Sequence, residues 1–241
     1  MERIRGAFLG LACGDALGAT LEFMSRDEIR RRYPGGHRDL TGGGAFGWAP
    51  GEITDDTAMA LAVARGIVAA GPDAPVDQLM TSVGQEFVRW AASGPKDIGG
   101  TVGLAIRAFR KFGDWEQASA HVRSVLGDRT AGNGALMRTL PVSLFWPDNP
   151  ERTVVVSRAL TRMTHPNPEA EWCSAVYNLY AQALLRGSGK APGWEGAVAT
   201  LTAAAPDLQP TAEALGRRMA GAGHLAEEKV RSTGYCVDTL E

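Results

Sequence analysis

Four oxygen-bearing side chains follow one another in the sequence: Thr54, Asp55, Asp56 and Thr57. Adjacent carboxylates repel each other unless a positive charge lies near them. A helix N-terminus supplies a small positive potential, which stabilises an acid by about 0.3–1 kcal/mol, whereas a divalent cation supplies far more. The segment is therefore either a capped helix start or part of a site for a hard cation such as Mg²⁺, and these residues alone leave both interpretations open.

Other acidic side chains could take part in the same chemistry. Asp15 and Glu22 are seven positions apart in an apolar, glycine-rich stretch, so on a helix they would share one face. If this face is buried, each acid needs a hydrogen-bond or charge partner; if the face is exposed to solvent, it needs none. Asp97 lies between Gly94 and Gly100, where an ordinary turn or N-cap is the commoner role of aspartate.

A second set of residues could bind a ligand instead of doing chemistry. Gly132, Asn133 and Gly134 form either a tight turn or a loop that exposes backbone N–H groups to phosphate or ribose oxygens. His165 precedes a proline and is more typical of a structural histidine, and Tyr235 would equally suit ordinary packing. No Ser/His/Asp or Cys/His pattern and no P-loop occurs.

The elements that must position these residues are predicted to be helices. Apolar periodicity indicates helices over 55–70, 76–92 and 115–126, with further helices around 104–112, after Asn149-Pro150 and up to Gly187. Residues 33–52 hold two prolines and seven glycines, so they are predicted to form a long loop. No stretch alternates as a strand does, and the sequence predicts one all-α domain over residues 1–241.

The first predicted helix carries glycine at every fourth residue. Gly6, Gly10, Gly14 and Gly18 share this spacing. It is typical of close helix–helix contact, and it also leaves backbone accessible to a ligand.

Composition excludes several classes of protein. The formal net charge is −2, which gives no sign of nucleic-acid or membrane-surface binding. The cysteines Cys13, Cys173 and Cys236 are far apart and odd in number, so they predict neither a metal motif nor a disulfide framework, as suits a cytoplasmic protein. No signal peptide and no apolar run long enough to span a membrane is found, and we expect no membrane or nucleic-acid partner.

Taken together and in order, these segments resemble the ADP-ribosylglycohydrolase family, and specifically its dinitrogenase-reductase-activating bacterial type. Any one match would be weak, but the whole ordered set covers nearly the entire chain. The matching segments are 6–10 with 14–18 and Glu22, 52–57, 96–99, 132–138, 164–166 and 234–240.

The resemblance implies a fold, a cofactor and roles for individual residues. The fold would be a single-domain orthogonal bundle of α-helices with two Mg²⁺ ions (Mn²⁺ being possible) in a cleft. The reaction would remove ADP-ribose from a modified protein side chain or small acceptor by cleaving the bond at the anomeric carbon. Thr54, Asp55 and Asp56 would be metal ligands, Glu22 and Asp97 catalytic acids, and the substrate-binding residues would be Gly132, Asn133, Gly134, His165 and Tyr235.

One departure from the family pattern affects the prediction of activity. The family's second metal half-site, Gly-Asp-x-Asp-Thr, would follow Gly234-Tyr235 by some tens of residues and is absent from this sequence. We therefore expect a C-terminally incomplete domain with weak metal binding. Two alternatives stay open: a non-catalytic relative that binds ADP-ribose, and a helical interaction scaffold. The acceptor specificity and the oligomeric state are not predicted.

Overall fold

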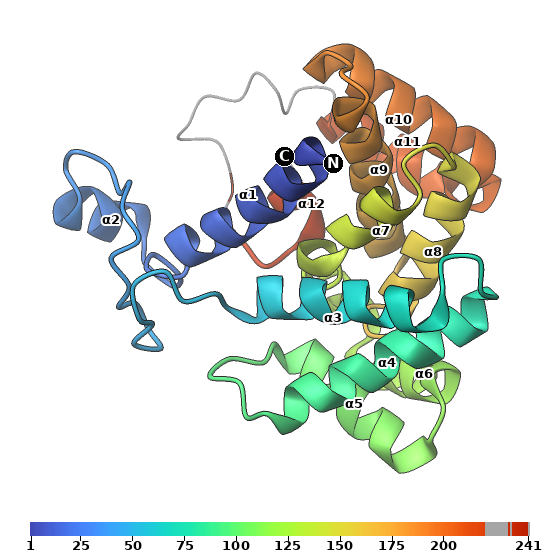
Figure 1. Ribbon diagram of the computed structural model, residues 1–241, viewed down its shortest axis with the longest axis horizontal. Helices are drawn as coiled ribbons and strands as arrows, with labels where there is room; N and C mark the ends of the chain where they lie inside the picture. Colours follow the sequence, from blue (N-terminus) through green and yellow to red (C-terminus); the bar gives the residue numbers. More distant parts are fainter. Residues whose placement is uncertain (220–230, 232, 241) are drawn as a thin grey trace.

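The computed structural model describes residues 1–219, 231 and 233–240, and this part of the chain is built from α-helices without a β-strand (Figure 1). The predicted all-α class is confirmed. In chain order the elements are α1 (Glu2–Gly18), α2 (Arg26–Arg32), α3 (Asp55–Ala70), α4 (Val76–Ala92), α5 (Gly100–Phe112), α6 (Trp115–Leu126), α7 (Leu140–Phe145), α8 (Pro150–Arg162), α9 (Pro168–Leu185), α10 (Lys190–Ala204), α11 (Gln209–Met219) and α12 (Cys236–Leu240), with 3-10 turns η1 (Gly127–Thr130), η2 (Leu136–Arg138) and η3 (Pro206–Leu208).

Local sequence signals account for most helix ends. Thr54 is the N-cap of α3, as predicted, and its hydroxyl accepts a hydrogen bond from the backbone N–H of Asp56 at 3.3 Å. The side chain of Asn149 caps α8 in the same way, accepting from Arg152 N–H at 2.9 Å. Helix α2 was not predicted, although Ser25 and Glu28 form a capping box at its start. Its seven residues are too few for apolar periodicity to show.

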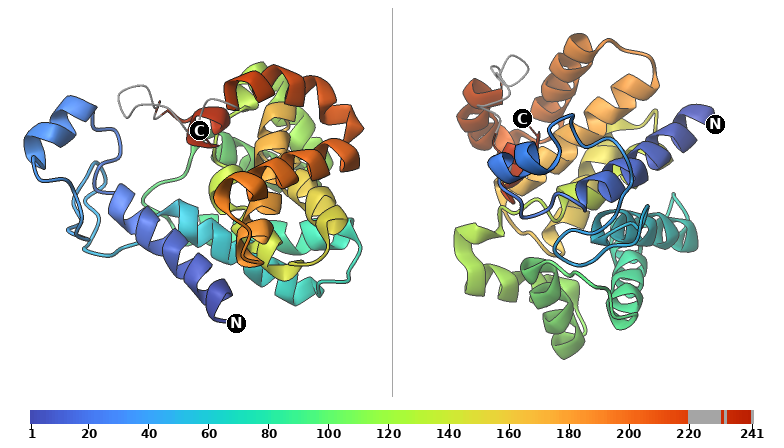
Figure 2. Two further views of the ribbon diagram at one scale, coloured as in Figure 1. Left: turned by 90° about the horizontal axis from the view of Figure 1, so that it is seen from above. Right: turned by 90° about the vertical axis from the view of Figure 1, so that its left-hand side faces the viewer.

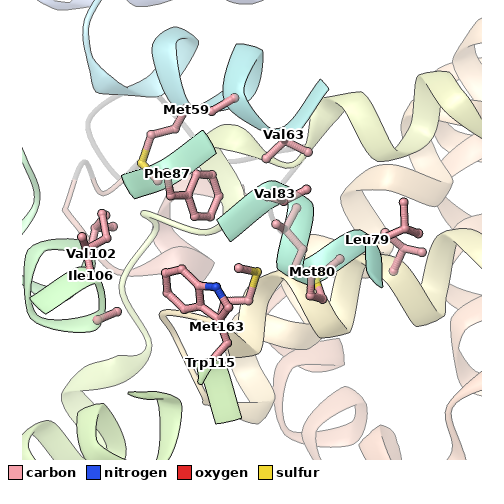
Figure 3. Close-up of a cluster of buried hydrophobic side chains, with 14 of the residues drawn as sticks. Met59, Val63, Leu79, Met80, Val83, Phe87, Val102, Ile106, Trp115 and Met163 are labelled. Atoms are coloured by element: carbon pink, nitrogen blue, oxygen red, sulfur yellow. The ribbon is translucent and has the colours of Figure 1, made fainter. Parts of the chain in front are cut away.

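The first hydrophobic core lies between α3, α4, α5 and α6, with contributions from α7 and α8 (Figure 3). Phe87 and Trp115 meet edge to face here, and Phe109 stacks on Trp115 with ring centroids 4.3 Å apart. Gly84 is needed where α4 passes the indole, because a Cβ at this position would lie 1.9 Å from Trp115 Nε1. This core fixes α3 and α5, whose N-terminal ends carry or adjoin predicted site residues.

A second core surrounds α9, which packs against α8, α10, α11 and α12. Trp172 is its largest buried side chain, and Cys173 and Cys236 lie in the same apolar cluster. Ala131 and Leu136 also belong to this core. The loop between them is therefore anchored at both ends, which is how a glycine-rich turn is kept in place.

Helix α1 lies across the start of α3, and α2 with the predicted loop at 33–52 projects to one side of the helices (Figures 1 and 2). The interpretation of the glycine spacing as close helix contact is wrong: a Cβ added at any of the four glycines of α1 would meet no described atom within 4 Å. Gly14 and Gly18 instead border a cleft. No described helix has the length and hydropathy needed to cross a membrane.

Candidate functional site

A cleft of about 1560 Å³ opens where the C-terminal end of α1, α2, the N-terminus of α3 and the loop before α5 come together. The turn at 132–134 and His165 complete its wall. Apart from Tyr235, each residue that the sequence predicts for the site contributes to the lining of this cleft. Those residues are Glu22, Thr54, Asp55, Asp56, Asp97, Gly132, Asn133, Gly134 and His165.

Asp15 joins α1 to the N-terminus of α3. Its Oδ2 accepts from the backbone N–H of Thr54 at 3.0 Å and of Thr57 at 3.2 Å, and its Oδ1 accepts from the Thr54 hydroxyl at 2.7 Å. The orphan N–H groups of a helix start are thus satisfied by a carboxylate from another helix. Sequence reasoning placed Asp15 on the face of Glu22 but gave it no role, because no local spacing signals a cap that is supplied from 39 residues away.

The carboxylates of this cleft crowd one another. Burial and the neighbouring acids Asp56 and Asp97 raise the pKa of Asp55 to about 7. Burial and the charge of Asp15 raise the pKa of Asp56 to about 6, and burial with Asp97 raises that of Glu22 to about 6. A cluster of acids with raised pKa values is typical of a functional site and favours a bound cation or proton.

The donor set fits a hard divalent cation by its chemistry. Carboxylate and hydroxyl oxygens are the ligands that Mg²⁺ prefers, and Asp55, Asp56 and Thr54 offer them from one helix start. The Thr54 hydroxyl donates its proton to Asp15 and keeps an oxygen lone pair for a ligand. Among the described residues, however, no three His, Cys, Asp or Glu side chains are gathered closely enough to hold a metal by themselves. Water or substrate oxygens would have to complete the coordination.

The turn at 132–134 is fastened to the segment before α12. Asn133 N–H donates to Gly234 C=O at 2.8 Å, Cys236 N–H donates to Ala131 C=O at 3.0 Å, and the Asn133 amide donates to the Thr239 hydroxyl at 3.1 Å. The side-chain amide of Asn133 is therefore engaged with α12. This cross-link between segments a hundred residues apart holds the glycines at the cleft.

Tyr235, which was predicted to contact substrate, does not line the cleft. It is half-buried against the second core, and the Arg218 guanidinium lies 5.6 Å from its ring centroid. Burial and a hydrogen bond with Glu169 raise the pKa of its hydroxyl. Its neighbours Thr233 and Gly234 reach the cleft instead.

His165 is buried, with only 2% of its surface exposed, yet it borders the cleft beside the glycine turn. A Cβ at Gly134 would lie 2.9 Å from His165 Cε1, and one at Gly132 would lie 3.4 Å from Nε2. The two glycines thus leave room for the imidazole edge. Burial and the positive charge of Arg138 lower the pKa of His165 to about 3, so the ring is neutral at physiological pH.

Lys96 ties the Asp97 loop to the glycine-rich segment at 33–52. Its ammonium lies 2.7 Å from Glu52 Oε2, 3.4 Å from Gly47 C=O and 5.0 Å from the centroid of the Trp48 ring. The same Glu52 oxygen accepts from the backbone N–H of Ala49 at 2.7 Å. We call these residues the Lys96 clasp; they link the loop that carries Asp97 to the segment that leads into Thr54.

We expect a K96M substitution to loosen this clasp without unfolding the protein. An exposed ion pair contributes at most about 1 kcal/mol, so the melting temperature should change little. Because Glu52 would lose its partner, the amides of Trp48 and Ala49 should exchange hydrogen several-fold faster, as hydrogen-exchange mass spectrometry can measure. The control is K190M, at an exposed lysine that starts α10. Unchanged exchange at both amides would show that the clasp orders nothing.

Comparison with known proteins shows which proteins this chain is similar to. The family profile described as ADP-ribosylglycohydrolase matches residues 1–241. The chain is 38% identical over 188 residues to the ADP-ribosyl-[dinitrogen reductase] glycohydrolase of Rhodospirillum rubrum, covering 78% of this chain and 60% of that protein. It is 32% identical to an ADP-ribosylarginine hydrolase of Serratia proteamaculans, covering 100% of this chain and 61% of that protein.

A solved structure is also similar to this chain. The structure titled ADP-ribosylglycohydrolase-related protein complex superposes with a TM-score of 0.74 at 31% sequence identity, covering 99% of this chain and 72% of the other. The chain spans about 60% of the length of the curated relatives named above. With the profile matched from end to end and the overall fold shared with a solved relative, the chain belongs to the ADP-ribosylglycohydrolase family.

Proposed function

We propose that this chain carries the substrate cleft of an enzyme that hydrolyses ADP-ribose from a modified side chain in the presence of Mg²⁺ or Mn²⁺. One observation carries the proposal: acidic groups, a neutral histidine and a glycine turn, drawn from segments far apart in sequence, line a single cleft of about 1560 Å³. Clefts of several hundred Å³ can bury about nine-tenths of the surface of a drug-sized ligand, so a cleft of this volume has room for a dinucleotide-sized group.

The acids of α1 and of the Asp97 loop suit glycosidic cleavage. Glu22, with a pKa of about 6, can be protonated or ionised near neutral pH and is the first choice for proton transfer at the scissile bond or its water. Asp97 lines the same cleft as a second acid, close enough that its charge acts on Glu22. An oxocarbenium-like transition state gains from the negative charge of ionised carboxylates around the anomeric carbon.

The start of α3 is the proposed cation site. Asp55 and Asp56 would be its carboxylate ligands, and Thr54 would add its hydroxyl oxygen. A divalent cation held there would neutralise these carboxylates and would act as a Lewis acid. Asp15 holds this helix start in place and so positions all three ligands.

A further part of the cleft lining suits the pyrophosphate. Gly100, Thr101 and Val102, the first turn of α5, line the cleft with backbone N–H groups that have no partner within the helix. Arg30 of α2 also borders it and brings a positive charge. Because the acids would repel phosphate, the polarity of the cleft fixes which end of ADP-ribose lies where.

We infer arginine as the preferred acceptor. The guanidinium of ADP-ribosylarginine is positively charged and would be attracted to Glu22 and Asp97, the two acids not assigned to the cation, whereas the ether oxygen of ADP-ribosylserine carries no charge. One of the two curated relatives named above is an ADP-ribosylarginine hydrolase, which supports the same class of substrate.

A hydrolysis assay on a panel of ADP-ribosyl conjugates tests the proposal. Peptides carrying ADP-ribosylarginine or ADP-ribosylserine, and a small ADP-ribosyl metabolite, would be incubated with and without Mn²⁺. We expect release of ADP-ribose from the arginine conjugate only with the cation present. Release that is independent of cation, or faster from serine, would contradict the proposed chemistry.

A second candidate is a module that binds ADP-ribose without hydrolysing it. It is favoured by the absence of a three-ligand cluster among the described residues. If ADP-ribose raises the melting temperature but no conjugate is cleaved, this alternative is correct. If ADP-ribose does not change the melting temperature, the remaining hypothesis is that the chain is a helical interaction scaffold.

The glycine turn offers a direct test of the binding side. A G134A substitution would bring a methyl group to 2.9 Å from the His165 ring and displace it. We expect the affinity for ADP-ribose to fall about tenfold, near 1.4 kcal/mol, as isothermal titration calorimetry would measure. The control is G216A in α11, where a Cβ meets no described atom within 4 Å. Equal affinities of the two variants would remove the turn from the binding site.

A further inference from the structure

Arg138 is a fully buried cation that the proposed mechanism does not use. It ends η2 with 0% of its surface exposed, and its guanidinium lies 4.6 Å above the Phe87 ring. Among the described residues no carboxylate forms an ion pair with it; its hydrogen bonds go to the Leu160 carbonyl at 3.4 Å, to Thr164 Oγ1 at 2.6 Å and, at 3.9 Å, to Met59 Sδ. A cation desolvated to this degree costs stability, so its placement calls for a reason.

The Thr164 hydroxyl connects Arg138 to His165. Its Oγ1 lies 2.6 Å from Arg138 Nη2 and 2.8 Å from His165 Nδ1. A guanidinium has only donors, so the threonine oxygen accepts from Arg138. The hydroxyl proton is then free to donate to Nδ1. In the opposite arrangement Nδ1–H would donate to Thr164, and the buried hydroxyl proton would have no acceptor among the described contacts.

We propose that Arg138 and Thr164 are positioning residues that fix His165 as the Nε2–H tautomer, with its one N–H donor directed at the ligand. The Nε2 edge of the ring lies against Gly132 and Gly134, which line the cleft. A neutral imidazole with Nδ1 as acceptor must carry its proton on Nε2. The chain Arg138–Thr164–His165 therefore converts a buried histidine into an oriented donor for an oxygen of the bound nucleotide.

The electrostatics agree with this arrangement. Arg138 lies close enough to His165 that its charge disfavours a second proton on the ring, and burial acts in the same direction. The histidine thus acts as a hydrogen-bond donor without being a cation. Its choice of ligand atom, a neutral or partly negative oxygen of ADP-ribose, rests on the proposed function, whereas the tautomer does not.

Nitrogen-15 NMR of the imidazole groups in the full chain tests the tautomer without any ligand. The chain has four histidines, and an H165Q variant identifies the resonances of His165. We expect a protonated Nε2 and an unprotonated, hydrogen-bonded Nδ1 at pH 7. In T164V the Nδ1 resonance should move to the position of an acceptor without a donor, and in T164S it should return. A protonated Nδ1 in the parent chain, or an unchanged Nδ1 resonance in T164V, would overturn the relay.

Calorimetry with ADP-ribose provides the functional arm. We expect Kd to rise about five- to tenfold in T164V, as for the loss of one oriented hydrogen bond, and to recover in T164S. If the NMR result holds but the parent chain does not bind ADP-ribose, the relay stands and the proposed function falls. If T164V shows the altered resonance but binds ADP-ribose as tightly as the parent, His165 is not the oriented donor.

Discussion

A D55N variant is expected to lose at least about a hundredfold in ADP-ribose release while its metal-free form becomes more stable than the parent. Asp55 is 8% exposed and lies among Asp56, Asp97 and Asp15, so its negative charge costs stability when no cation is present. The amide keeps the shape and removes the charge. A hundredfold loss corresponds to about 2.7 kcal/mol, the lower end of what removal of one preorganised electrostatic group from an active site typically costs.

The pH dependence of stability checks the sign of this effect. In the folded chain the pKa of Asp55 is raised from 3.8 to about 7. Folding therefore favours the protonated acid, and the free energy of unfolding should fall as the pH rises from 4 through 7. In the presence of a chelator the parent should melt about 5 °C lower at pH 8 than at pH 5.5, for a loss on the order of 2 kcal/mol.

Three measurements decide between the outcomes for D55N. Differential scanning fluorimetry with chelator should show a smaller decrease between the two pH values than in the parent. Added Mn²⁺ should stabilise the parent and have little effect on the variant. The control is D77N, which changes an exposed acid in the first turn of α4, away from the cleft. Undiminished turnover in D55N would refute the assignment of Asp55 to the cation site.

Replacing Asp15 by alanine is expected to lower the free energy of unfolding by about 2–4 kcal/mol. The carboxylate accepts from Thr54 N–H, the Thr54 hydroxyl and Thr57 N–H. Both backbone donors would lose this partner at a part-buried helix start, and the hydroxyl would keep only Asp56 Oδ2 at 3.3 Å. Urea denaturation with equal m-values for parent and variant would measure the loss. The change in stability has the opposite sign to that expected for metal-free D55N, because the Asp15 carboxylate stabilises the folded chain whereas the Asp55 carboxylate destabilises it.

The comparison of D15A with D15N separates the two roles of this carboxylate. The D15N variant keeps one acceptor oxygen, so it should recover part of the lost stability. Because Asp15 positions Thr54, Asp55 and Asp56, both variants should weaken Mn²⁺ binding, which calorimetry can follow. A variant that is as stable as the parent would mean that α3 is capped without help from α1.

Much of the fold follows from local sequence. The limits of α3, α4 and α6 agree with apolar periodicity and with side-chain caps such as Thr54 and Asp114, because these interactions lie within one turn of the chain. Short elements were not predicted. Helix α2 has seven residues and α7 has six, so neither shows a full apolar period. The meaning of the glycines in α1 depended on whether another helix approaches them, which no local pattern records.

For the candidate site, the sequence by itself determined which residue types are available and, through the ordered resemblance to a family, which segments should meet. Only the tertiary structure decided how they meet. It brings Asp15 to the N-terminus of α3, turns Tyr235 toward the second core, and links Arg138 through Thr164 to His165. Hydrogen bonds and burial depend on distances between segments that are tens to hundreds of residues apart, and such distances are set by helix packing rather than by spacing along the chain.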